Sequence, residues 1–108
     1  MCRGELYRIY RGHKNDPKDF RVFVVVSRQT LIDSNFSTVI CAPVYSRFEG
    51  LSTQLGIGIN EGLKRNSSVF CDELISIEKA RLTDYVGSVS GIKLGQLMAC
   101  LRIAVGVE

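Results

Sequence analysis

Alternation of hydrophobic and polar residues predicts short β-strands along most of the chain. The run from Phe20 to Ser27 is the least ambiguous of them, and Pro43 belongs at the end or edge of the strand that contains it, since proline lacks an N–H. Gly56 and Gly58 favour a bent or bulged strand. The strands are expected at residues 5–10, 20–27, 37–44, 52–59, 67–77 and 82–89.

A different period follows Ser90, where apolar residues recur at i, i+3, i+4 and i+7. They are Leu94, Leu97, Met98, Leu101, Ala104 and Val105. This spacing predicts an amphipathic helix that ends the chain. Polar loops are expected at residues 11–19 and 45–50, and a short helical turn at 29–34. The fold class is therefore mostly β (α+β), a compact barrel-like antiparallel sheet with a helix on one side.

Composition narrows the class of protein without naming a function. The 108 residues fit one domain, 1–108, and 45% hydrophobic and 23% charged residues are typical of globular proteins. The longest apolar run, residues 22–26, is too short to span a membrane, and no apolar signal stretch opens the chain, so we expect a cytoplasmic protein. The net charge of +3 permits an anionic partner without requiring one.

The four cysteines favour neither disulfides nor a metal site. They are Cys2, Cys41, Cys71 and Cys100, which lie about thirty or more residues apart, and the chain has a single histidine. We expect three buried thiols and one near the N-terminus, with no metal and no cofactor.

Five segments, in their order and spacing, resemble the MazF/PemK family of toxin endoribonucleases. They are Arg3–Tyr7, Phe20–Ser27, Thr38–Ser46, Ser68–Glu73 and Leu101–Gly106. The resemblance covers nearly the whole chain. It implies a small SH3-like β-barrel with a C-terminal helix, a homodimer, and messenger RNA cleavage that a cognate antitoxin suppresses. A flexible acidic segment of the antitoxin would then occupy the RNA groove.

The chemistry of RNA cleavage directs attention to Arg21, Tyr45 and Ser46. RNA carries its own nucleophile, the 2′-hydroxyl, so the enzyme needs a cation and two proton-handling groups. Arg21 resembles the family's catalytic arginine, although Val22 follows it where proline is common. Tyr45 and Ser46 stand where the family usually has Thr-Ser; the tyrosine could bind the phosphate, donate a proton, stack on a base, or simply cover the barrel edge.

Other candidates rest on their place in predicted loops or on a strand. The general base stays open between His13, Asp16 and Asp19, all in the first loop. Asp72 matches a position that faces the RNA groove in the family, and on a strand it would point away from a buried Cys71. A positive track for phosphates, or ordinary solvated charges, is formed by Lys14, Lys18, Arg47, Lys64 and Arg81.

Two other functions compete with RNA cleavage. Gyrase-poisoning toxins share this barrel, but they act through a C-terminal segment with a tryptophan, and the chain has none. A catalytically silent nucleic-acid-binding module is the second alternative, because Tyr45 and Val22 depart from the family pattern.

Overall fold

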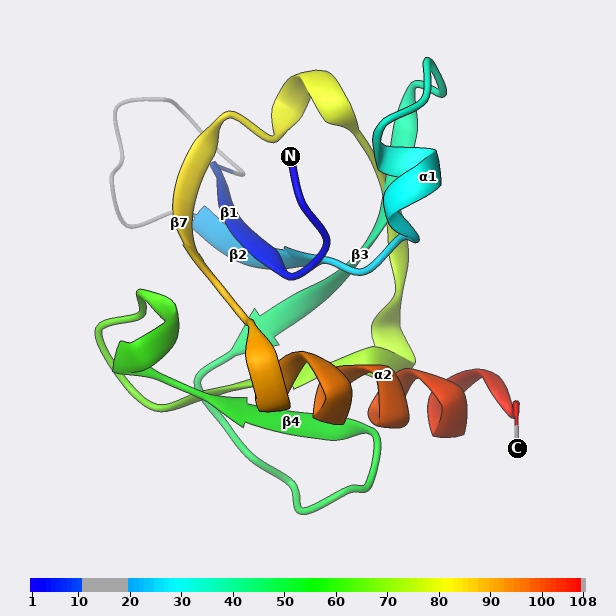
Figure 1. The fold of residues 1–108 in the computed structure, drawn as a ribbon. Coiled ribbons are helices and arrows are strands. Elements are labelled where there is room, and N and C mark those ends of the chain that lie inside the picture. The colour runs from blue at the N-terminus through cyan, green and yellow to red at the C-terminus, as the bar shows by residue number, and fades with distance from the viewer. Residues whose placement is uncertain (11–19, 108) are drawn as a thin grey trace.

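The computed structural model describes residues 1–10 and 20–107, and β-strands dominate them (Figure 1). The strands are β1 (Glu5–Tyr10), β2 (Phe20–Val25), β3 (Thr38–Tyr45), β4 (Gln54–Ile57), β5 (Ser67–Phe70), β6 (Ile75–Glu78) and β7 (Asp84–Ser88). The α-helices are α1 (Gln29–Ile32) and α2 (Gly91–Val105). Three 3-10 turns, η1 (Ile59–Glu61), η2 (Cys71–Glu73) and η3 (Lys79–Arg81), connect the later strands.

The described strands form one curled antiparallel sheet. Its order is β4-β5-β3-β2-β1-β7, with β6 paired to the first half of β3. β1 pairs with β7 from Glu5 opposite Ser88 to Arg8 opposite Asp84, so the first strand lies against the last. Figure 1 shows α2 running along one side of the curl, where it packs on β4 and η2. The predicted mostly-β fold with a C-terminal helix is confirmed.

Both faces of the central strands are buried, which explains the continuous apolar run of β2. Val24 and Val25 are each fully buried, but they belong to different clusters because successive side chains point to opposite faces. Val24 packs with Leu6, Val69 and Leu97 beneath α2. The second cluster, on the other face, contains Val25, Ile9, Cys41 and Ile77 among its members. Burial on both faces removes the alternation expected of a half-exposed strand.

Two sequence predictions about the strands were wrong. Residues 67–77 form not one strand but β5 and β6, separated by η2, because β5 pairs with Val44–Tyr45 of β3 whereas β6 pairs with Thr38–Cys41. Pro43 does not end β3 but lies inside it, opposite Phe23 of β2. Both differences share one cause. On the edge of β3 that faces away from β2, residues 42 and 43 pair with neither β6 nor β5. The chain therefore breaks between β5 and β6, and a proline without an N–H is tolerated at this unpaired stretch.

No helix within residues 1–10 and 20–107 is long and apolar enough to cross a membrane.

Candidate active site

A cavity of about 670 Å³ brings Arg21 together with Tyr45 and Ser46, from which it is separated by more than twenty residues in the sequence. Arg21 at the start of β2 and Tyr45 and Ser46 at the end of β3 all line it. The pairing of β2 with β3 continues to Val22 opposite Val44, so Arg21 and Tyr45 stand one step beyond this pair on neighbouring strands. The rest of the lining is Arg8, Tyr10, Phe20, Val22, Val44, Gly62, Leu63, Lys64, Arg65, Ser67 and Val86.

The guanidinium groups of two arginines stack on the ring of Tyr45. The Cζ atom of Arg21 lies 4.3 Å from the ring centroid and that of Arg47 lies 4.7 Å from it. Phe70 meets the same ring edge to face, with centroids 4.7 Å apart, and the Tyr45 hydroxyl donates a 2.8 Å hydrogen bond to Glu73 Oε1. A ring held at its edge and its hydroxyl is a fixed platform for both cations. The guanidinium of Arg21 thus lies against the ring of Tyr45.

Four basic side chains line the cavity, Arg8, Arg21, Lys64 and Arg65, and its described lining contains no carboxylate. Arg8 lies opposite Val22, whereas Arg21 lies opposite Ile9, so the two arginines leave the β1–β2 pair from opposite faces. They therefore approach the cavity from two sides. A cavity with this excess of positive charge favours anions such as phosphate.

Sequence reasoning missed Arg8. Its guanidinium stacks on Phe20 at 4.7 Å, and Nη1 donates to Asp84 Oδ2 at 3.4 Å. The Nε atom of Arg8 is buried and has no partner among the described residues. The signal was the alternation itself: Leu6 and Arg8 point to the same face of β1, and Leu6 is fully buried, so a cation two residues along on that face was already unusual.

Lys64 and Arg65 lie in a turn, here called the Gly58–Arg65 turn, that is held by the buried Glu61 side chain and by close packing on β7. One oxygen of the buried Glu61 side chain, Oε1, accepts hydrogen bonds from Gly58 N at 2.7 Å and from Lys93 Nζ of α2 at 3.1 Å. Gly62 adopts a φ of +97°, and a Cβ there would lie 2.3 Å from the carbonyl oxygen of Val86 in β7. The turn thus lies directly on β7, and only glycine permits the approach.

The remaining predicted residues do not all reach the cavity. Lys64 lines it, and Arg47 lies beside it on Tyr45. Asp72 is exposed as predicted, but it lies in η2 rather than on a strand, and its Oδ2 accepts a 2.6 Å hydrogen bond from Thr53. Arg81 lies in η3, which follows the pairing of Glu78 with Thr38 at the opposite end of β3 from Tyr45. His13, Lys14, Asp16, Lys18 and Asp19 lie outside the described residues.

The cysteines take no part in this cavity. Cys41, Cys71 and Cys100 are buried, as predicted, and Cys2 near the N-terminus is exposed. Burial raises the pKa of the Cys41 and Cys71 thiols to about 12, so neither provides a thiolate at neutral pH. Within residues 1–10 and 20–107, no three His, Cys, Asp or Glu side chains gather as they would to hold a metal ion.

Comparison with known protein families identifies the family to which the chain belongs. The family model described as the PemK-like, MazF-like toxin of type II toxin-antitoxin systems matches residues 3–105. The chain belongs to this family. It is therefore a type II toxin of the PemK/MazF family, and the resemblance first noted in its sequence is confirmed. Among curated proteins, no sequence matches it.

Solved structures of PemK/MazF toxins share the fold at low sequence identity. A mycobacterial endoribonuclease in complex with its cognate antitoxin superposes with a TM-score of 0.83 at 20% identity, over 100% of this chain and 97% of that one. The Mycobacterium tuberculosis toxin MazF-mt6 gives 0.80 at 18%, over 96% and 98%. MazF in a MazE-MazF complex from Deinococcus radiodurans gives 0.76 at 17%, over 100% and 97%.

Proposed function

We propose that this PemK/MazF-family toxin is an endoribonuclease that cleaves single-stranded RNA in the Arg21–Tyr45 cavity. The observation that carries the proposal is the cavity's charge: four basic side chains and no carboxylate in its described lining. Phosphate binding needs such a site, and the exposed Tyr10 on its wall offers an aromatic ring to unpaired bases. Two of the solved relatives are themselves described as mycobacterial endoribonucleases.

The reaction that fits these residues uses the RNA's own 2′-hydroxyl and needs no metal. The 2′-oxygen bonds to the adjacent phosphorus while the bond from phosphorus to the 5′-oxygen breaks, which leaves a 2′,3′-cyclic phosphate and a 5′-hydroxyl. Arg21 would hold two phosphate oxygens and stabilise the charge that grows on them. One proton must leave the 2′-hydroxyl and another must reach the 5′-oxygen; the base remains open between His13, Asp16 and Asp19.

Tyr45 and Ser46 take different roles in this scheme. The Tyr45 hydroxyl is already bonded to Glu73, so its contribution is to position the guanidinium of Arg21 through its ring. Ser46 carries an exposed hydroxyl at the cavity wall, where it could donate a hydrogen bond to the phosphate or the leaving oxygen. The family's Thr-Ser pair would thus be divided here into a positioning residue and a hydroxyl donor.

We also propose that the toxin acts in the cytoplasm as a homodimer and that an acidic antitoxin segment blocks the same cavity. Two copies about a twofold axis would form a longer RNA groove than one small barrel offers. The carboxylates of such a segment would bind the cations that otherwise hold phosphates, so inhibition should be competitive with RNA and weaken with salt. The relative with the highest TM-score quoted above is a complex with its cognate antitoxin.

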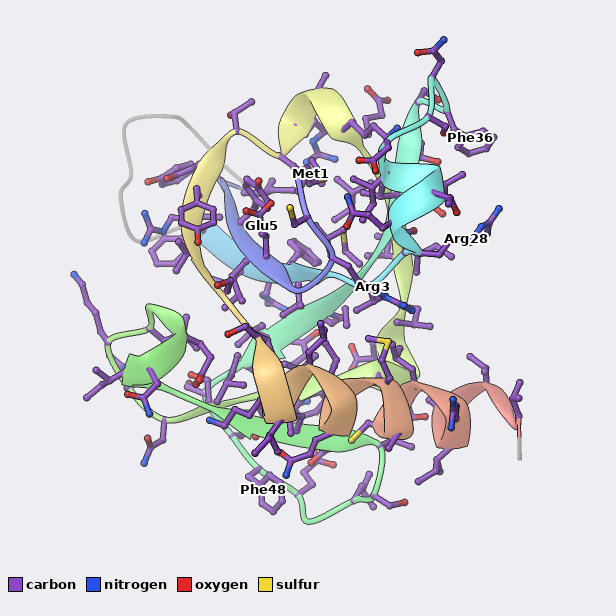
Figure 2. The ribbon with its side chains drawn as sticks, viewed as in Figure 1. Met1, Arg3, Glu5, Arg28, Phe36 and Phe48 are labelled. Atoms are coloured by element: carbon purple, nitrogen blue, oxygen red, sulfur yellow. The ribbon has the colours of Figure 1, made fainter. Side chains whose placement is uncertain are left out.

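The decisive experiment is cleavage of a long single-stranded RNA in excess chelator. Arg21→Ala should lower the rate by on the order of a hundredfold or more, and the wild type should leave a cyclic phosphate. Arg28→Ala is the matched control: Arg28 is exposed beside α1 (Figure 2) and does not line the cavity, so its removal should change nothing. Binding without cleavage would identify a silent nucleic-acid-binding module, and gyrase inhibition without RNA cleavage a gyrase poison.

A further inference from the structure

A second cavity, of about 770 Å³, adjoins the first. Ser46 and Ser67 line both cavities, so an extended ligand in one can continue into the other. The walls of the second cavity are the loop after β3 (46–48), the segment from β4 into η1 (56–61), the start of β5 (66–68) and Lys93 of α2. Its size falls within the roughly 300–1,000 Å³ of typical ligand pockets.

The charges of the second cavity are largely paired, unlike those of the first. Lys93 is bonded to Glu61 at 3.1 Å, and Arg47 Nε donates to Glu49 Oε1 at 3.0 Å. A phosphate placed here would compete with carboxylates that already hold both cations. The second cavity is therefore suited to a neutral polar group rather than to an anion.

Its lining instead offers apolar surface and side-chain amides. Phe48 is 63% exposed and Ile59 is 77% exposed, although both are large hydrophobic residues that gain free energy when a ligand covers them. Asn60 and Asn66 each present a donor and an acceptor, the combination that recognises the edge of a base. An aromatic face with amides is typical of protein sites that bind unpaired RNA bases.

Two glycines keep the cavity open in this arrangement. At Gly56 no atom lies within 4 Å of the position that a Cβ would take, so the wall there is bare backbone facing free space. At Gly58 a Cβ would lie 3.0 Å from Asn66 Oδ1, so a larger residue would displace that amide. The glycines thus leave room for a ligand and let Asn66 stay where it can contact one.

We propose that this second cavity binds the base of the nucleotide next to the scissile phosphate, with Phe48 stacking on the base and Asn60 and Asn66 reading its edge. The proposal rests on the proposed RNA cleavage in the first cavity. The cavity would then determine which base is accepted at one position of the cleavage site, while Arg21 determines the rate.

The test is cleavage of a randomised single-stranded RNA library, with the cut sites read by sequencing. Asn60→Ala and Asn66→Ala should each relax the base preference at one position, by roughly five- to hundredfold, the discrimination expected of a side-chain contact with a base. Phe48→Ala should raise KM with a smaller effect on kcat. Asn35→Ala and Phe36→Ala are the matched controls; both residues are exposed, and Figure 2 shows Phe36 and Phe48 at opposite ends of the molecule.

A second measurement covers variants that lose activity. An oligonucleotide with 2′-deoxyribose at the cut site cannot be cleaved, so its binding reports recognition alone. Asn66→Ala should weaken binding of the preferred sequence and leave binding of a sequence with that one base exchanged unchanged. Equal cleavage preferences and equal affinities in wild type and variants would overturn the proposal. A wild type that cuts no RNA would instead overturn the proposed function.

Discussion

Removing the Glu61 carboxylate should destabilise the protein, because this one side chain fixes the Gly58–Arg65 turn. The side chain is 7% exposed, and its Oε1 accepts from Gly58 N and from Lys93 Nζ. Glu61→Ala would leave the Gly58 N–H buried without a partner, which costs about 1–3 kcal/mol. Loss of the ion pair with the half-exposed Lys93 adds at most about 1 kcal/mol. The total is about 1–4 kcal/mol.

Two further variants separate these contributions. Glu61→Gln keeps an acceptor for Gly58 N but removes the charge, so we expect a loss of about 1 kcal/mol. Lys93→Met removes only the ion pair and should cost no more than that. Glu78→Ala is the control, since Glu78 is an exposed carboxylate on β6.

Thermal unfolding at a fixed protein concentration measures the differences. For a chain of this size a loss of a few kcal/mol lowers Tm by on the order of 10 °C, so the Tm of Glu61→Ala should lie well below that of Glu61→Gln. Equal Tm losses for the two Glu61 variants would refute the reasoning, because they would show that the hydrogen bond to Gly58 contributes nothing. A Tm unchanged by Glu61→Ala would refute it outright.

Two other predictions concern Tyr45 and the buried thiols. Tyr45→Phe loses only the exposed bond to Glu73 and keeps the ring beneath Arg21, so cleavage should stay within a few-fold of wild type; a hundredfold fall in kcat would show that the hydroxyl takes part in the chemistry. Burial raises the pKa of Cys41 and Cys71 from 9.0 to about 12, so stability is full below pH 9 and falls between pH 9 and 12, by up to about 1.4 kcal/mol per pH unit for each thiol. Urea unfolding of Cys41→Ala at several pH values should show a shallower fall, and an unchanged slope would contradict the assignment.

The sequence predicts best where one local rule decides the structure. The bounds of β1 were correct, and α2 was recognised because apolar residues at helical spacing give only one solution. The break between β5 and β6 was missed because η2 is only three residues long and β-forming residues flank it, Val69 and Phe70 before it and Ile75 and Ile77 after it. At η2 the chain passes from the end of β3 that pairs with β5 to the end that pairs with β6. This change depends on pairing partners that lie far away in the sequence.

Some residues of the candidate site could be predicted from the sequence and others could not. Arg21, Tyr45 and Ser46 were found through family resemblance, and the cavity unites them. Arg8 and Arg65 were not found, because their place beside Arg21 depends on strand register and on the packing of the Gly58–Arg65 turn against β7. The alternation of β1 puts Arg8 on the same face as Leu6, but neither the strand register nor the packing of the turn leaves a local signal in the sequence. Arg81 shows the converse error, since a basic residue in a loop need not lie near the others.

The pairing of β1 with β7 has a consequence for folding during synthesis. Glu5 leaves the ribosome well before its partner Ser88, which is added more than eighty residues later. Contacts at such separation form slowly, so β1 must wait with an unpaired edge while most of the chain is made. Val86 of β7 also lines the cavity that holds Arg21. A nascent toxin therefore completes its cavity only after β7 has been made, and an incomplete chain lacks one wall of that cavity.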